Sequence, residues 1–123
     1  MSGTLKALRG ELIDTITQLT TYDHVPARVN LPCAFIMAGS PYIAAGDTFG
    51  ERQIRFGVVI LTAPSLNSIE TDELDAWIED IQAALEGAGW LVESTDQPRI
   101  ESLGEQQDVL ATTINVATYA TFD

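Results

Sequence analysis

Side chains able to do covalent or proton-transfer chemistry are scarce in this sequence. Its one histidine, His24, stands beside Asp23 in a stretch flanked by proline. A serine triad would need His24 as its base, but no nucleophile-elbow motif supplies a serine for it. The one cysteine, Cys33, lies in an apolar segment, as expected of a small core side chain and not of an activated nucleophile. The sequence therefore favours a polar loop histidine and a structural cysteine.

Sites for metals and nucleotides are poorly supported. A zinc site needs about four nitrogen or sulfur ligands, which one cysteine and one histidine cannot supply within one chain. A calcium loop needs Asp or Asn alternating around a glycine, and no such stretch is present. The glycines of "GAGW", residues 87–90, follow a predicted helix, so they indicate a helix stop and not a phosphate-binding loop. We therefore predict no cofactor and no bound metal.

Carboxylates are the one abundant functional group. The chain has 18 acidic and 6 basic residues, for a formal net charge of −12. The densest acidic cluster, residues 70–80, opens a predicted helix, where acids favour the positive end of the helix dipole. That position gives the cluster a structural reason, although a small enzyme built on paired carboxylates stays open as an alternative.

The charge balance also bears on the partners of the protein. A protein that grips nucleic acid needs clustered Lys and Arg side chains, and here the bases are mostly scattered. We therefore expect no specific binding of DNA. The longest apolar runs are too short to span a bilayer, which argues against a membrane partner. A lone cysteine allows no intrachain disulfide and suits a reducing compartment.

The elements that must position these residues begin with two amphipathic helices. Between Leu5 and Leu19 apolar residues step by three or four, which predicts a helix over about residues 4–20. Asn67 resembles the start of a capping box and Gly87 a left-handed C-terminal cap, so a second helix is predicted between them. Its buried stripe is formed by Leu74, Trp77, Ile78, Ile81 and Leu85.

Between the helices the sequence predicts a hairpin of strands. Residues 20–32 form a loop, and the apolar run at 33–39 is a short strand that Ser40-Pro41 breaks. Residues 42–45 can form a second short strand. Gly46-Asp47 is a hairpin-type turn signal that leads into a long strand, residues 51–62.

After the second helix, the sequence predicts two further strands. Residues 90–94 form one, residues 108–122 form a strand rich in β-branched side chains, and the segment 95–107 is a polar connection. This order of elements argues for a single α+β domain over residues 1–123. It contains an antiparallel or mixed sheet of four to five strands packed with two amphipathic helices.

The long strand 51–62 raises a question about its second side. One side carries Ile54, Phe56, Val58 and Ile60, as expected of a core face. The other side begins charged at Arg55 and ends apolar at Val59 and Leu61. The outer face of a sheet covered on one side should be wet to its end. Val59 and Leu61 therefore need a cover, which the second helix or a loop of the same chain could provide.

Three stretches taken together resemble a known family. They are "DHVPARVNLPCAFIMAGSPYI", "GDTFGERQIRFGVVIL" and "VESTDQPRI", and they combine with an acidic helix "TDELDAWIEDI" and a Thr-rich final strand. The pattern resembles the tail terminator proteins of long-tailed, siphovirus-type phages of actinobacteria, which are similar to the lambda-type tail terminator. The resemblance covers nearly the whole chain.

The resemblance implies a structural protein of the virion without catalytic residues, assembled in the host cytoplasm and placed at the junction of tail and neck. Such a protein forms a ring, usually a homohexamer, that caps the last ring of the major tail tube protein and stops its polymerisation. It also offers a surface for head–tail joining through a connector or stopper protein. DNA passes through the hole, and an acidic lumen would repel its phosphates. Another phage neck protein is the main alternative.

The family reading predicts which residues contact neighbours. A neighbouring subunit could cover Val59, Leu61 and Tyr119, and Arg52 and Arg55 could meet an acidic surface of that neighbour. The hairpin with Tyr42 and Phe49, and the connection with Arg99, are predicted to contact other proteins of the neck. The alternatives are that these arginines are solvated and that Phe49 tucks under its own turn.

Overall fold

The computed structural model describes residues 4–22, 31–62, 68–103 and 107–122. These residues form two helices and a six-stranded mixed sheet, which confirms the predicted α+β class. The elements in chain order are α1 Thr4–Thr15, β1 Thr20–Tyr22, β2 Cys33–Ala45, β3 Glu51–Thr62, α2 Ser68–Gly87, β4 Leu91–Thr95, β5 Arg99–Leu103 and β6 Gln107–Thr121.

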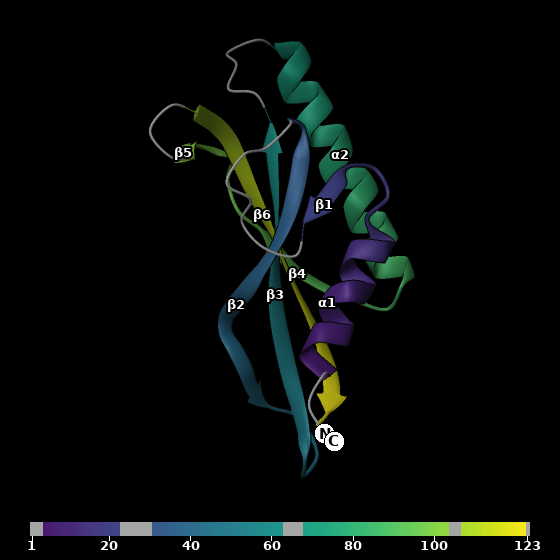
Figure 1. The fold of residues 1–123 in the computed structure, drawn as a ribbon. Helices are drawn as coiled ribbons and strands as arrows, with labels where there is room; N and C mark the ends of the chain where they lie inside the picture. The colour runs from purple at the N-terminus through teal and green to yellow at the C-terminus, as the bar shows by residue number, and fades with distance from the viewer. Residues whose placement is uncertain (1–3, 23–30, 63–67, 104–106, 123) are drawn as a thin grey trace.

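The strands lie in the order β1-β2-β3-β6-β4, and β5 also pairs with β6. β1 runs parallel to β2, and the other pairs are antiparallel. β4 pairs with residues 114–117 of β6, and β5 pairs with residues 107–111. Both strands therefore lie on the same edge of β6, one after the other along its length. Both helices lie on one face of the sheet, called the helix face below, and we call the opposite side the second face (Figure 1).

The first helix ends earlier than its periodicity predicts. α1 stops at Thr15, yet Ile16 and Leu19 remain buried in the core although they are no longer helical. The chain then forms β1, where Thr20 pairs with Cys33 at the start of β2. The predicted loop is therefore wrong for residues 20–22, because pairing with β2 overrides a local sequence without a strong strand pattern. The rest of that loop, including His24, lies outside the described residues.

The second strand is continuous where a break was predicted. β2 spans 13 residues, and its pairing register with β3 shifts between Ala38 and Ile43. Ser40-Pro41 thus produces an irregularity within the strand and does not end it. A proline is tolerated here because β1 pairs with β2 only at Cys33–Phe35, which leaves Pro41 on an edge of the described sheet.

The second helix ends in a motif two residues beyond the glycine predicted to cap it. Gly87 is still helical, and the left-handed residue is Gly89, with φ of 94°. The Trp90 N–H donates to the Leu85 carbonyl (3.0 Å), and the Gly89 N–H donates to the Glu86 carbonyl (3.1 Å). These two bonds define a Schellman motif, and the buried side chains of Trp90 and Leu85 provide its hydrophobic contact. The other end of the predicted helix, Asn67, lies outside the described residues.

The main core lies between the helices and the helix face. Ile54, Phe56, Val58 and Ile60 of β3 are fully buried in it, as the alternation predicts. The Phe56 ring meets Tyr42 and Trp90 edge-on, with ring centroids 5.7 Å and 6.0 Å apart. The helices cover this core with buried side chains, which are Leu12 of α1 and Leu74, Ile81 and Leu85 of α2. Trp77 of α2 is only partly buried.

The polar connection predicted at residues 95–107 contains a strand. Residues 99–103 form β5, which pairs with β6 from Arg99 opposite Ala111 to Leu103 opposite Gln107. Its short, charged sequence gives no clear alternation, and its place is set by pairing with β6. β1 and β5 together explain why the sheet has six strands where four to five were predicted.

Candidate functional site

The second face has an apolar end that its own chain closes. Cys33, Phe35, Val59, Leu61 and Val109 form a separate buried cluster, against which Tyr22, Leu31 and Ala111 pack. Val59 and Leu61 are 5% and 1% exposed. Their own chain therefore buries these two side chains without a neighbouring subunit. Cys33 is fully buried, and burial raises the pKa of its thiol, which keeps it neutral and unreactive.

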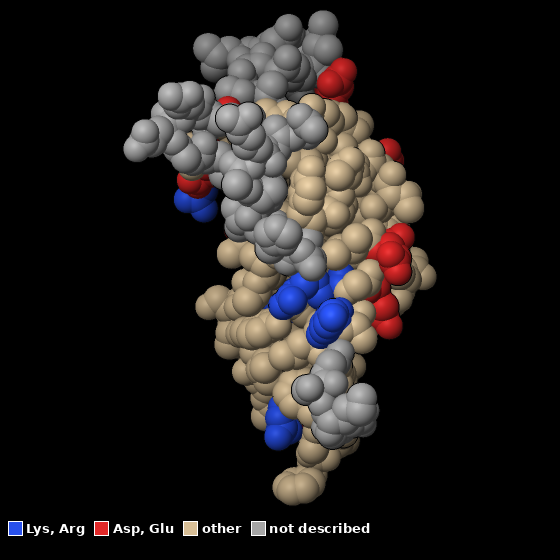
Figure 2. All heavy atoms as spheres, viewed as in Figure 1, with Lys and Arg blue, Asp and Glu red and all other residues tan. Residues whose placement is uncertain are grey.

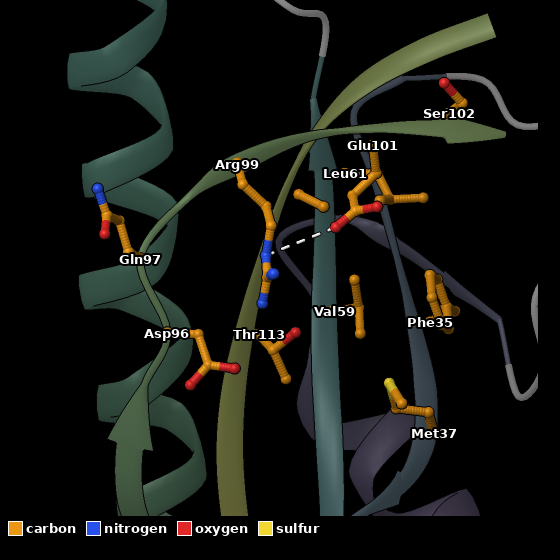
Figure 3. Close-up of a pocket in the computed structure, with 11 residues that line it drawn as sticks. Phe35, Met37, Val59, Leu61, Asp96, Gln97, Arg99, Glu101, Ser102 and Thr113 are labelled. Atoms are coloured by element: carbon orange, nitrogen blue, oxygen red, sulfur yellow. Dashed lines mark ion pairs between the residues drawn. The ribbon is translucent and has the colours of Figure 1, made fainter.

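Beside this cluster the second face is hollowed. A cavity of about 310 Å³ lies beneath β5 and the segment that precedes it (Figure 3). Its floor is apolar and is formed by Phe35, Met37 and Val59 of the sheet. Polar side chains that include Asp96 also line it, and Arg99 and Glu101 of β5 stand at its rim. These two rim side chains are 71% and 51% exposed and form a loose ion pair of 3.5 Å. An apolar floor with a charged rim is suited to hold an apolar side chain of a partner.

Further along, the second face becomes polar. The Arg55 guanidinium forms an ion pair with Glu93 of β4 (2.9 Å), which is a partner inside its own chain. Asn115 of β6 donates from its amide to the Ser94 hydroxyl and to the Asp96 carboxylate, each at 3.0 Å. Arg55 therefore has a partner inside its own chain, because β4 brings Glu93 to it, and both side chains remain partly exposed.

The β2–β3 hairpin ends in a turn with one uncovered aromatic side chain. The Gly46 N–H donates to the Glu51 carbonyl (2.8 Å), and the Asp47 N–H donates to the Glu51 carboxylate (3.0 Å). Gly50 has φ of 85°, a left-handed conformation that favours glycine. Phe49 between them is fully exposed, so it does not tuck under its own turn. The turn is thus held by a backbone bond and by a bond to the Glu51 carboxylate, and it presents Phe49 to solvent.

The other predicted contact residues differ in how far they are exposed and in the partners they have within the chain. Tyr42 is half-buried against Phe56 and accepts a hydrogen bond from Arg9 (3.3 Å), so it belongs to the core. Arg52 donates to the carbonyl of Glu51 (3.3 Å). Tyr119, which lies opposite Gln53 on the second face, is 45% exposed. The structure therefore brings Val59, Leu61 and Arg99 together around the cavity, and places Phe49 and Arg52 at the hairpin.

Two residues of this surface were not singled out from the sequence. Met37 is 45% exposed in the floor of the cavity, and the alternation from Cys33 through Phe35 could have placed it on the second face. Glu93 could not have been paired with Arg55, because the register of β4 on β6 shifts between Val92 and Ser94.

Charged side chains are distributed unevenly over the described surface. On the face in Figure 2, the visible bases lie mainly near the middle and the acids toward the margin. Four of the described bases engage their own chain: Arg9 with Tyr42, Arg52 with the Glu51 carbonyl, Arg55 with Glu93, and Arg99 with Glu101. Among the described residues, no group of three or more His, Cys, Asp and Glu side chains could hold a metal. No helix in the described part of the chain is long and apolar enough to cross a membrane.

Neither a protein-family model nor a curated protein sequence matches the chain.

Proposed function

We propose that this protein is a tail terminator of a long-tailed phage, a structural ring protein and not an enzyme. The observation that carries the proposal is the resemblance of residues 23–43, 46–61 and 92–100, within a matching order of elements, to that family. In this proposal a ring of six copies binds the last ring of tail tube protein and blocks further addition. The opposite side of the ring receives a connector or stopper protein of the head.

The surface of the chain suits a subunit of an assembly. A fully exposed aromatic at the end of a hairpin and an apolar cavity with a charged rim are features that a partner would cover. The charge suits a channel for DNA, because six copies would carry about −70 if all groups were ionised. Acids facing the lumen would repel phosphate, so that DNA slides without sticking.

The direct test is polymerisation of purified tail tube protein in the presence of this chain. Tubes should stop growing when the protein is added in amounts far below that of tube subunits, because each tube needs one ring. Electron microscopy should show an added ring at one tube end. The control is the double variant Phe49→Ala, Arg99→Ala, which keeps the fold because both side chains are exposed, and should cap tubes poorly.

Two other results would redirect the assignment. Binding to head connectors without any effect on tube growth would indicate another neck protein. A large rise in melting temperature at micromolar divalent metal, with no binding to either tubes or heads, would favour a carboxylate-based enzyme.

A further inference from the structure

The outer edge of β5 has no partner strand among the described residues. β5, Arg99–Leu103, pairs with β6 on one side, and no other described strand pairs with it. It lies away from both helices (Figure 1). Backbone N–H and C=O groups along such an edge are a template for another strand. β5 contains no proline and no register shift that would blunt this edge.

Ile100 is an uncovered apolar side chain in the middle of β5. It lies opposite Leu110 of β6 and therefore shares the helix face with it, yet Ile100 is 62% exposed. Side chains directly opposite each other on neighbouring strands contact and stabilise the pair. A strand added to the outer edge of β5 would therefore cover Ile100.

The charges of β5 complement a second copy of the same strand. Arg99 and Glu101 flank Ile100 and share the second face, opposite Ala111 and Val109 of β6. When two β5 strands run antiparallel with Ile100 opposite Ile100, each Arg99 lies opposite the Glu101 of the other copy. Opposite charges in such facing positions stabilise the pair. Within one chain the two groups form only a loose ion pair of 3.5 Å and are 71% and 51% exposed.

Two other carboxylates near β5 are engaged within their own chain. The Asp96 carboxylate accepts a hydrogen bond from the Asn115 amide (3.0 Å), and the Asp108 carboxylate accepts one from the Ser102 hydroxyl (3.0 Å). Asp96 precedes β5, and Asp108 belongs to β6, so neither lies in the facing pairs next to Ile100. These facing pairs bring together two arginines and two glutamates, which carry no net charge.

We propose that two copies of this protein pair through the outer edges of β5, antiparallel and centred on Ile100. The contact is isologous, because each copy presents the same residues, and it continues one sheet into the other across a two-fold axis. The paired segment is short, so we expect weak association that requires a high protein concentration. The contact joins two copies and no more, so it is separate from the proposed ring and does not depend on the terminator function.

Charge reversal tests the register on the full purified chain by analytical ultracentrifugation. Arg99→Glu and Glu101→Arg should each weaken self-association by at least about tenfold, because each variant sets like charges opposite each other on both sides of Ile100. A one-to-one mixture of the two variants should associate again, since one copy then presents two acids and the other two bases. The control variants Lys6→Glu and Glu86→Arg make the same changes in net charge at exposed positions on the helices, and each should associate like the native protein.

Disulfide trapping tests the centre of the contact. Ile100→Cys should form a covalent dimer under mild oxidation, because facing residues of an antiparallel pair have Cα atoms about 4.5–5.5 Å apart, within the range of a disulfide. The control is Leu91→Cys, which is 53% exposed on β4. Native Cys33 should not react, because it is fully buried. The dimer through position 100 should form at least about tenfold faster than the dimer through position 91, because pairing raises the effective concentration of the two thiols.

Three results would overturn the contact, whether or not the chain caps tubes. They are equal trapping at positions 100 and 91, a native protein that stays monomeric at every concentration, and a mixture of the two β5 charge variants that associates no better than each variant alone. Preferential trapping and restored association in a protein that fails to cap tubes would keep the contact and reject the terminator function.

Discussion

The two faces of this sheet are built from the same strands and reach different outcomes. On the helix face, alternate residues of β3 are buried along the strand under α1 and α2. On the second face, the same strand changes from buried Leu61 and Val59 to the ion-paired Arg55. Strand alternation thus decides which residues share a face, but the elements outside the strand decide how much of that face is dry.

The largest expected effect compares adjacent residues of β3 that point to opposite faces. Ile60→Ala should cost about 4 kcal/mol of unfolding free energy, because Ile60 is fully buried in the main core. Leu61→Ala should cost about 2 kcal/mol, because Leu61 lines the open cavity and its removal enlarges a space that solvent already reaches. Urea unfolding measures both. Equal losses would mean that the second face is packed as tightly as the helix face.

The Schellman motif that ends α2 can be tested by substituting its two glycines one at a time. Gly89→Ala should destabilise the protein by about 1–2 kcal/mol, because φ of 94° strains any residue with a Cβ. Gly87→Ala is the matched control and should stabilise by up to about 1 kcal/mol, since Gly87 is helical. An added Cβ meets no atom within 4 Å at either position, so the difference reports backbone conformation alone. The opposite order in thermal melts would reject the Schellman motif at Gly89.

Whether the core on the helix face excludes water can be tested with two adjacent threonines of β6, which point to opposite faces. Thr112 is 1% exposed opposite Ile60, and its hydroxyl finds no hydrogen-bond partner in the described structure. Thr112→Val should therefore stabilise by about 1 kcal/mol. Thr113→Val, on the half-buried second face, should change stability by less than about 0.5 kcal/mol. If Thr112→Val destabilises, the hydroxyl has a partner, such as an ordered water, and this part of the core is wet.

The smallest expected effect concerns the ion pair on the second face. A double-mutant cycle of Arg55→Ala and Glu93→Ala should give a coupling of about 0.5 kcal/mol, because both side chains remain partly exposed. The coupling should fall further in 1 M salt, where the Debye length is about 3 Å. A coupling several times larger would indicate that this end of the second face is shielded from water, for example by another subunit.

Sequence periodicity captured the elements with strong local signals. β3 was predicted with its observed bounds, and its core side chains were assigned correctly, because alternation over a long strand is unambiguous. β1 and β5 were missed because their short sequences carry no periodic pattern and become strands only by pairing with β2 and β6. The cavity could not be predicted either, since it depends on β5 crossing above residues that are distant in sequence.

The irregular middle of β2 also affects the behaviour of the protein at high local concentration. An open strand edge is a template on which another chain can add, and repeated addition leads to fibrils or precipitates. In the described sheet, the edge of β2 beyond Phe35 contains Pro41, which has no amide hydrogen to offer, within a stretch of shifted register. This edge is therefore a poor template for strand addition, and copies brought close together are hindered from joining strand to strand along it.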